Sequence, residues 1–192
     1  MSQAPQDSAR KLLASAGLPE DFLDKLRLES DWSFVIKLHS LFEAVLASLI
    51  VKRLNAPAVQ EAIVNLEFNN VKSGKVAFAR ALALIDARDG AFLRGLSELR
   101  NKLVHDIRNV QFDLRSYVSG MDHKQRKKFK AEFGKAICSL KTGEPTYNRL
   151  FKEQPSLIIY LASYSCLLSL EFNVTNQRRN MLIEALMKRA AK

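Results

Sequence analysis

The chain has 192 residues, of which 47% are hydrophobic and 26% charged, a composition that indicates one folded domain and excludes general disorder. Its 30 Lys and Arg residues outnumber 20 Asp and Glu residues, and the formal net charge of +10 favours polyanionic partners, nucleic acid above all. The two cysteines, Cys138 and Cys166, form no metal-ligand spacing with the three histidines, so we predict buried, reduced thiols and neither a metal nor a cofactor.

No targeting or membrane segment is expected. The first residues lack the basic and then apolar pattern of a signal peptide. The longest apolar run, 157–170, contains Ser163, Tyr164 and Ser165, and at about 14 residues it is too short and too polar for a membrane span. We therefore predict a cytoplasmic protein that does not associate with membranes.

The expected fold is all-α, with long central and C-terminal helices. Only 7 Gly and 5 Pro interrupt the chain, and no strand pattern is present. Residues 1–30 are predicted to form an N-terminal helical extension, and 31–192 a single helical domain. The central helix over about 31–54 begins at Ser30 or Asp31 and carries apolar residues around most of its circumference. Shorter helices over 58–66 and 76–85 follow.

The next helix, predicted over about 90–107, carries the most informative pattern. One buried stripe is predicted at helical spacing for Leu96, Leu99, Leu103 and Ile107. Asn101 and His105 are four residues apart, so they are expected to be neighbours on the helix surface. Arg100 is long enough to reach a ligand held by His105. A permanently charged fork, an amide and a titratable imidazole together suit a phosphate-bearing substrate.

A basic amphipathic helix is predicted over about 122–140. Its apolar positions keep helical spacing at Phe129, Phe133, Ile137 and Leu140. The cations of this helix and of the preceding one are candidate contacts to an RNA backbone: Lys102, Arg108, Lys124, Arg126, Lys127, Lys128 and Lys130. The alternative is that the run of cations over 124–130 is simply a charged helix face that contacts only solvent. His123 is expected to be such a solvated residue.

The last helix is predicted over about 155–188. Its first half is apolar around most of its circumference, and its second half is amphipathic. The segment 157–170 has more apolar surface than one core-facing stripe can bury, which favours a homodimer unless the domain itself encloses this helix. Tyr160 and Tyr164, four residues apart, are expected in the core or at an interface.

The pattern Arg100-Asn101-x-x-x-His105 resembles the signature of the HEPN superfamily, which has an arginine, a polar residue, any three residues and a histidine. Residues 31–43 and the order of helices over roughly 30–120 resemble the branch that includes the mannitol operon repressor. The resemblance implies a HEPN-type helical bundle with these residues in a cleft between two protomers. It also implies that Arg100 stabilises a phosphate, His105 handles a proton, and Asn101 orients one of them.

From this resemblance we expect an RNA-binding protein that cleaves RNA without a metal, as a toxin or in defence. Such a reaction needs a base for the 2′-OH, cations for the developing charge, and an acid for the leaving 5′-oxygen, and it leaves 2′,3′-cyclic phosphate ends. One chain supplies a single good acid or base, so a twofold dimer would complete the set. The alternative is a non-catalytic regulatory module similar to the mannitol operon repressor, which binds another protein.

Candidate partners therefore include an antitoxin or another regulatory protein. Some HEPN toxins carry a tyrosine two residues after the histidine, which the antitoxin modifies, but this chain has Ile107 there, so that form of control is not implied. His39 and Glu43, four apart on the central helix, are candidate supporting residues that orient Arg100 or His105, or else a plain helical pair. Structural alternatives remain for the motif: an ion pair of Arg100 with Glu43, a hydrogen-bonded structural His105, and a surface Asn101.

Overall fold

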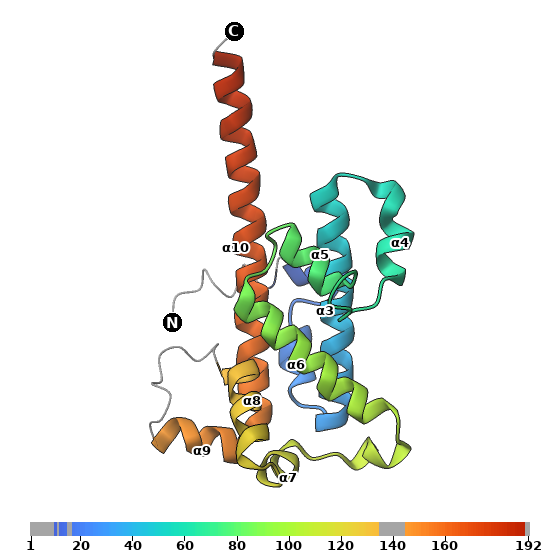
Figure 1. The fold of residues 1–192 in the computed structure, drawn as a ribbon, viewed down its shortest axis with the longest axis vertical. Helices are drawn as coiled ribbons and strands as arrows, with labels where there is room; N and C mark the ends of the chain where they lie inside the picture. The colour runs from blue at the N-terminus through green and yellow to red at the C-terminus, as the bar shows by residue number, and fades with distance from the viewer. Residues whose placement is uncertain (1–9, 11, 15–16, 135–144, 191–192) are drawn as a thin grey trace.

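The computed structural model describes residues 10, 12–14, 17–134 and 145–190 (Figure 1). Every regular element within these ranges is a helix, which confirms the predicted all-α class. The elements in chain order are α2 (Phe22–Leu26), α3 (Asp31–Leu54), η1 (Pro57–Val59), α4 (Gln60–Asn65), α5 (Lys75–Ala81), α6 (Ala87–Val104), η2 (Ile107–Gln111), α7 (Leu114–Ser119), α8 (His123–Phe133), α9 (Pro145–Glu153) and α10 (Pro155–Ala190).

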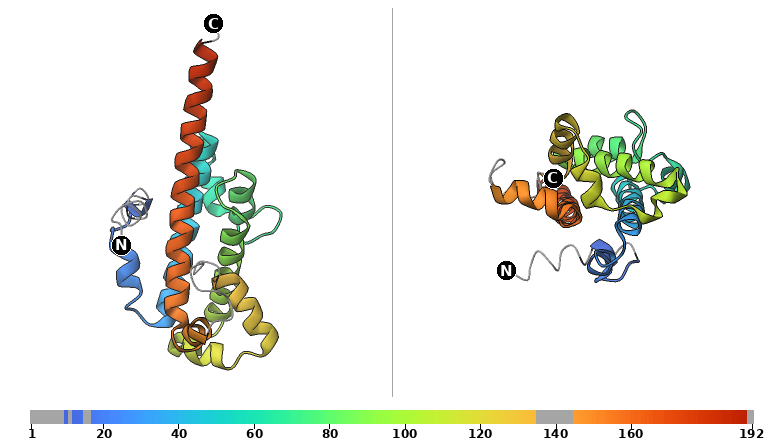
Figure 2. Two further views of the ribbon diagram at one scale, coloured as in Figure 1. Left: turned by 90° about the vertical axis from the view of Figure 1, so that its left-hand side faces the viewer. Right: turned by 90° about the horizontal axis from the view of Figure 1, so that it is seen from below.

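The central helix of the bundle is α3. Ser30 begins it as predicted, because the Ser30 hydroxyl accepts a hydrogen bond of 3.3 Å from the backbone N–H of Ser33. Asn55 ends it in the left-handed conformation with φ of 50°, which Asn tolerates better than most residues. Buried residues occur around most of its circumference because α2, α4, α5 and α6 pack around it (Figure 2).

Helix α6 crosses α3 and packs against α8 on its other side (Figure 1). A capping box begins it: Asp86 accepts from the Asp89 backbone N–H at 2.9 Å, and the Asp89 carboxylate accepts from the Asp86 N–H at 3.3 Å. Gly95 permits the close approach of α8, because a Cβ at this position would lie 2.9 Å from the Cβ of Glu132. This approach fixes the position of the motif helix between the core and α8.

The long C-terminal helix is confirmed as α10. Among the side chains of α10 that the structure describes, the last to donate hydrogen bonds to the body are Asn173, from Nδ2 to Leu84 O at 3.0 Å, and Gln177, from Nε2 to Ala83 O at 2.9 Å. Beyond this point α10 projects away from the other helices (Figures 1 and 2). Its first half packs partly into the body: Ile158, Ile159, Leu167 and Leu170 are buried, whereas Tyr160, Tyr164 and Leu168 are half-buried and Leu161 is 38% exposed. The predicted homodimer stays a prediction.

Two helical segments are long and apolar enough to cross a membrane by length and composition: α3 and Pro155–Gln177 of α10. The expectation that the C-terminal apolar segment is too short is therefore wrong, because it continues past Leu170. Most of the apolar stretch of α3 is buried inside the bundle, and the core helix of a soluble protein has the same length and composition. Cytoplasmic localisation stays a prediction.

The N-terminal extension packs on the bundle. Leu23 and Leu26 of α2 are buried, and Asp24 Oδ1 accepts a hydrogen bond of 2.7 Å from the Tyr160 hydroxyl on α10. Burial and the hydrogen bond to Asp24 raise the pKa of Tyr160 to about 12. Residues 1–9 lie outside the described ranges, so the structure places the extension only from its helical part onward.

The basic helix α8 begins with a capping box formed by Asp122 and Gln125, as the sequence position of Asp122 favours. It ends at Phe133, before the predicted limit at 140, with Gly134 as its C-cap. Phe129 and Phe133 are buried as expected. Ile137, Cys138 and Leu140 lie outside the described residues. The other thiol, Cys166, is buried, and burial together with nearby Asp89 raises its pKa.

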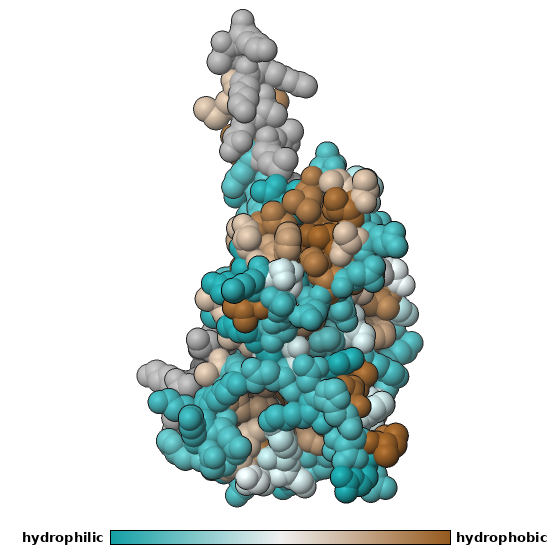
Figure 3. All heavy atoms as spheres, turned by 45° about the vertical axis from the view of Figure 1, so that its right-hand side comes forward, coloured by the Kyte–Doolittle hydropathy of each residue, from teal (hydrophilic) through white to brown (hydrophobic). Residues whose placement is uncertain are grey.

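A groove of about 670 Å³ lies between α3 and α4. Small residues of α3 form one side of it, among them Ala44, Ala47 and Ser48, and Val64 of α4 forms the other. Figure 3 shows an apolar area at the height of α4 on this side of the molecule.

Candidate functional site

The motif residues lie where α6 ends. The helix stops at Val104, and His105 is its C-cap, so the prediction of a helix to 107 is wrong. Asp106 begins η2 instead, because its carboxylate accepts from the Arg108 backbone N–H at 2.9 Å. Asn109 Nδ2 donates to the carbonyl of Lys102 at 2.9 Å and so satisfies one of the free carbonyls at the end of α6.

This early end corrects the predicted apolar stripe. Leu96, Leu99 and Leu103 are buried, but Ile107 lies beyond the helix and is 83% exposed. Val104 and Val110, which flank Ile107 in sequence, are also exposed. Three apolar side chains close to His105 in sequence are therefore exposed, and we name them the Val104–Ile107–Val110 patch. Sequence periodicity missed it because periodicity assumes that the helix continues.

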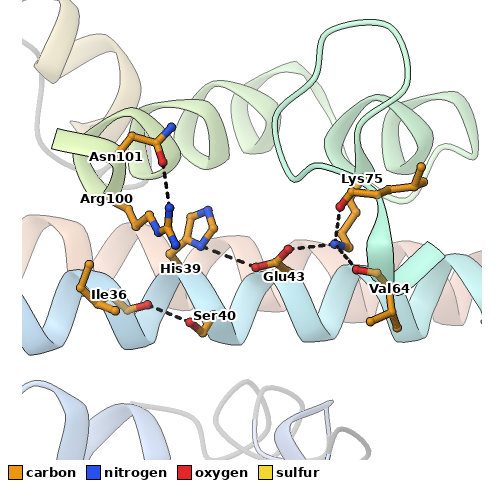
Figure 4. A network of polar contacts seen from close by, with 9 residues as sticks. Ile36, His39, Ser40, Glu43, Val64, Lys75, Arg100 and Asn101 are labelled. Atoms are coloured by element: carbon orange, nitrogen blue, oxygen red, sulfur yellow. Dashed lines mark hydrogen bonds and ion pairs between the residues drawn. The ribbon is translucent and has the colours of Figure 1, made fainter. Parts of the chain in front are cut away.

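Arg100 and Asn101 contact each other on the last turns of α6. Arg100 Nη1 donates to Asn101 Oδ1 at 3.1 Å, and Arg100 is half-buried whereas Asn101 is exposed (Figure 4). His105 is exposed beyond them, and within the described residues it has no side-chain hydrogen bond to either. The three motif residues therefore lie at one end of α6, with two of them in contact.

His39 of α3 lies beside the Arg100 guanidinium (Figure 4). It is 5% exposed, its ring lies 4.5 Å from that of Phe68, and its Nδ1 is 3.9 Å from Glu43 Oε2. Burial lowers the pKa of His39 to about 4, with Arg100 and Lys75 acting in the same direction and Glu43 in the opposite one. The imidazole is therefore neutral at pH 7. Its Nε2 is buried without a hydrogen-bond partner in the described part of the chain.

Glu43 binds Lys75, a residue that sequence reasoning missed. Lys75 is fully buried, and its Nζ donates to Glu43 Oε1 at 2.8 Å, to Val64 O at 2.8 Å and to Leu66 O at 2.6 Å (Figure 4). The three donors of the ammonium group are thus all used. The alternative of an Arg100–Glu43 ion pair is wrong, because Glu43 contacts Lys75 and His39 instead.

The predicted RNA-contacting cations fall into two groups. Several are engaged with the protein: Lys102 Nζ donates to the Tyr117 hydroxyl at 2.8 Å, Arg108 forms a fork with Asp106, and Arg126 Nη2 donates to Met121 O at 2.8 Å. Lys130 contacts Asn148 and Lys128 binds Glu98. Lys124 and Lys127 are exposed on α8. The basic run is therefore partly used for structure.

A cleft of about 390 Å³ separates the motif helix from the basic helix. Lys102 and Glu98 of α6 line one side, Lys128 and Glu132 of α8 line the other, and Tyr117 of α7 also lines the cleft. Burial raises the pKa of Glu132, while hydrogen bonding to Glu98 raises the pKa of Lys128. Acidic and basic side chains therefore lie close together in this cleft.

Among the described residues, no group of three or more His, Cys, Asp and Glu side chains is placed to hold a metal ion. The chain matches no protein-family model, and no curated protein or solved structure matches it. The resemblance to the HEPN superfamily therefore rests on the motif and the order of helices in this chain.

Proposed function

We propose that this chain is a HEPN-type RNA-binding protein that cleaves RNA without a metal, as a toxin or in defence. The observation that carries the proposal is the grouping of Arg100 and Asn101 on the last turns of α6 with His105 exposed at its C-cap. A fixed cation and an accessible imidazole at one exposed end are the groups that metal-free phosphodiester cleavage uses.

Each motif residue has a distinct role in the proposal. Arg100 neutralises charge that develops on the phosphorane oxygens, and its bond to Asn101 orients the guanidinium. His105 acts as the acid or the base, because imidazole is the side chain most often used for proton transfer in catalysis and this one is accessible at the end of α6. His39 and Glu43 support the site from below: His39 lies against Arg100, and Glu43 holds Lys75 between α3 and the end of α4.

A twofold dimer at this end of the molecule would bring two His105 and two Arg100 side chains together, which supplies both an acid and a base. The Val104–Ile107–Val110 patch supports this arrangement, since exposed apolar patches mark protein interfaces. The exposed Lys124 and Lys127 would contact RNA phosphates without reading sequence.

Expression in a bacterium distinguishes an RNA-cleaving enzyme from a non-catalytic binding protein. Wild type is expected to arrest growth and fragment cellular RNA, while the Arg100→Ala/His105→Ala double variant does neither at equal protein level. His123→Ala is the matched control, because His123 is an exposed histidine on α8, and it should arrest growth like wild type. Growth arrest by the double variant would contradict the catalytic role of the motif.

The second candidate function is a non-catalytic regulatory module similar to the mannitol operon repressor, which acts by binding another protein. The projecting half of α10 favours it, because this half exposes Ile183, Leu186 and Met187. A wild type that leaves RNA intact while altering gene expression would select this candidate.

A further inference from the structure

The cleft of about 390 Å³ between α6 and α8, which α7 also borders, has the composition of a ligand site (Figure 1). Ligand pockets are mostly apolar, hold a few converging polar groups and have volumes of roughly 300–1,000 Å³. The buried lining of this cleft is apolar and includes Leu99, Met121 and Phe129. Its more accessible lining is charged: Glu98, Lys102, Lys128 and Glu132. A flat ring with polar edges suits such a lining, because its faces can contact the apolar side chains while its edges reach the charged ones.

Two carboxylates in the cleft converge on one ammonium group. Lys128 Nζ lies 2.5 Å from Glu98 Oε2 and 3.6 Å from Glu132 Oε1. The other two carboxylate oxygens, Glu98 Oε1 and Glu132 Oε2, accept no hydrogen bond from any residue that the structure describes. Each oxygen of a carboxylate is an acceptor. The cleft therefore offers two unused acceptors around one lysine donor.

The Glu132 carboxylate has lost much of its contact with water. Its side chain is only 16% exposed, and its Oε2 lies 2.9 Å from the position that a Cβ would occupy at Gly95, so the absence of a side chain there leaves room for this carboxylate. Burial raises the pKa of Glu132, because the ionised form is poorly solvated. N–H groups of a ligand would replace the lost water, so this position favours a ligand that donates hydrogen bonds.

The cleft lies along the face of α6 that carries His105. Glu98, Lys102 and His105 are separated by four and then three residues, a spacing that places them on one face of a helix. The backbone of His105 is helical, with φ of −85° and ψ of −8°, so this spacing extends past Val104. His105 is therefore about 5 Å beyond Lys102 along the axis of α6. A base held in the cleft would have its ribose and phosphate close to the motif.

We propose that the cleft binds a guanine base of RNA next to the scissile phosphate, with Glu98 and Glu132 accepting hydrogen bonds from its N1–H and its N2 amino group. This proposal rests on the proposed function and names the base that the same site selects. Guanine alone among the four bases has two neighbouring donors on its Watson–Crick edge, and its O6 beside them accepts from a lysine. Adenine, cytosine and uracil each place an acceptor next to a donor there, which leaves a carboxylate oxygen facing another acceptor.

Nucleotide binding tests the base preference without any cleavage step. Calorimetric titration of the full chain is expected to give GMP a Kd at least tenfold lower than that of AMP, UMP or CMP. Glu98→Gln and Glu132→Gln should each weaken GMP binding at least tenfold and leave AMP binding unchanged, because glutamine presents one acceptor and one donor group where a carboxylate presents two acceptors. Glu61→Gln, at an exposed position on α4, is the matched control and should bind GMP like wild type.

Equal affinity for the four nucleotides, or GMP binding that Glu98→Gln leaves unchanged, overturns the proposal. Glu98 is exposed, so this variant tests the site even where Glu132→Gln does not fold. A protein that prefers GMP in this way but leaves RNA intact would contradict the proposed nuclease and still support the guanine site. The two proposals therefore fail separately.

Short RNAs distinguish a base of RNA from a free nucleotide. The His105→Ala protein, in which cleavage is blocked, is expected to bind a five-nucleotide RNA with guanosine at the centre and uridine elsewhere at least tenfold more tightly than the same RNA with adenosine at the centre. Glu98→Gln in the same background should remove this difference. Equal binding of the two RNAs by a protein that prefers GMP would assign the cleft to a free guanine nucleotide and overturn its role in RNA recognition.

Discussion

At the residue scale, the buried polar side chains beneath the motif helix hold the site together. His39 is kept neutral by burial, and Arg100 and Lys75 add to the cost of charging it. Lys75 Nζ donates hydrogen bonds to Glu43 and to two backbone carbonyls. Substitution of either side chain is therefore expected to change the free energy of unfolding.

The pKa of His39 predicts an acid-dependent loss of stability. Below pH 6.5 the unfolded chain binds a proton at this histidine, but the folded chain binds it only near pH 4, so the free energy of unfolding falls as pH is lowered through this window. The full contribution is about 3 kcal/mol. Urea unfolding at pH 7.0 and pH 4.5 should show that His39→Phe flattens this dependence. An identical slope in wild type and variant would contradict the assignment.

Replacing Lys75 is expected to destabilise the fold strongly. Lys75→Met leaves Val64 O and Leu66 O without their donor and removes the partner of Glu43, at a cost of about 3 kcal/mol. Lys72→Met is the matched control, because Lys72 is exposed in the preceding turn, and it should change the midpoint little. Thermal unfolding of both variants measures the difference; equal midpoints would show that the three bonds do not matter.

The importance of Lys75 was not predictable from the sequence. Its three acceptors lie 9, 11 and 32 residues away, and only the packing of α3, α4 and α5 brings them to one point. The proximity of His39 and Glu43 was predictable, because a four-residue spacing on a helix places side chains side by side. That His39 is buried against Arg100 again depends on how α6 crosses α3.

At the element scale, helices were easier to predict than their ends. The central and C-terminal helices follow from long apolar periodicity and few Gly and Pro residues. The end of α6 at Val104 depends on local side-chain bonds from Asp106 and Asn109, which compete with the continuing helix. This end determines where His105 and Ile107 lie, so the exposed patch beside the motif could not be predicted from the periodicity.

Because α6 packs closely against α8 at Gly95, alanine substitutions at two glycines of α6 are expected to change stability differently. Gly95→Ala places a Cβ 2.9 Å from the Cβ of Glu132, and the resulting shift of α8 is expected to cost about 2 kcal/mol, more than the better helix propensity of Ala returns. Gly90→Ala on the same helix meets only flexible arginine side chains, the nearest atom being 3.3 Å away, and should be neutral or stabilising. Denaturant midpoints compare them; a stable Gly95→Ala would show that α8 tolerates the shift.

At the scale of the whole molecule, the proposed assembly at the motif end depends on the Val104–Ile107–Val110 patch. Ile107→Glu is expected to weaken the dimer formed at this end at least tenfold and to lower RNA cleavage in parallel, since each active site needs both copies. Leu28→Glu is the control, because Leu28 is equally exposed but lies before α3. Sedimentation equilibrium and a cleavage assay on the same samples measure both effects. Full cleavage by an Ile107→Glu protein that no longer self-associates at this end would contradict the shared site.

Metal-independent cleavage through His105 is tested most directly by incubating RNA with the purified protein in excess EDTA and analysing the new ends. Wild type is expected to cut RNA and leave 2′,3′-cyclic phosphates, because His105 and Arg100 would direct the 2′-OH at the adjacent phosphorus. His105→Ala should lower the rate at least a hundredfold, whereas His123→Ala should retain it. Cleavage that requires a divalent metal, or a His105→Ala protein as active as wild type, would contradict the proposed mechanism.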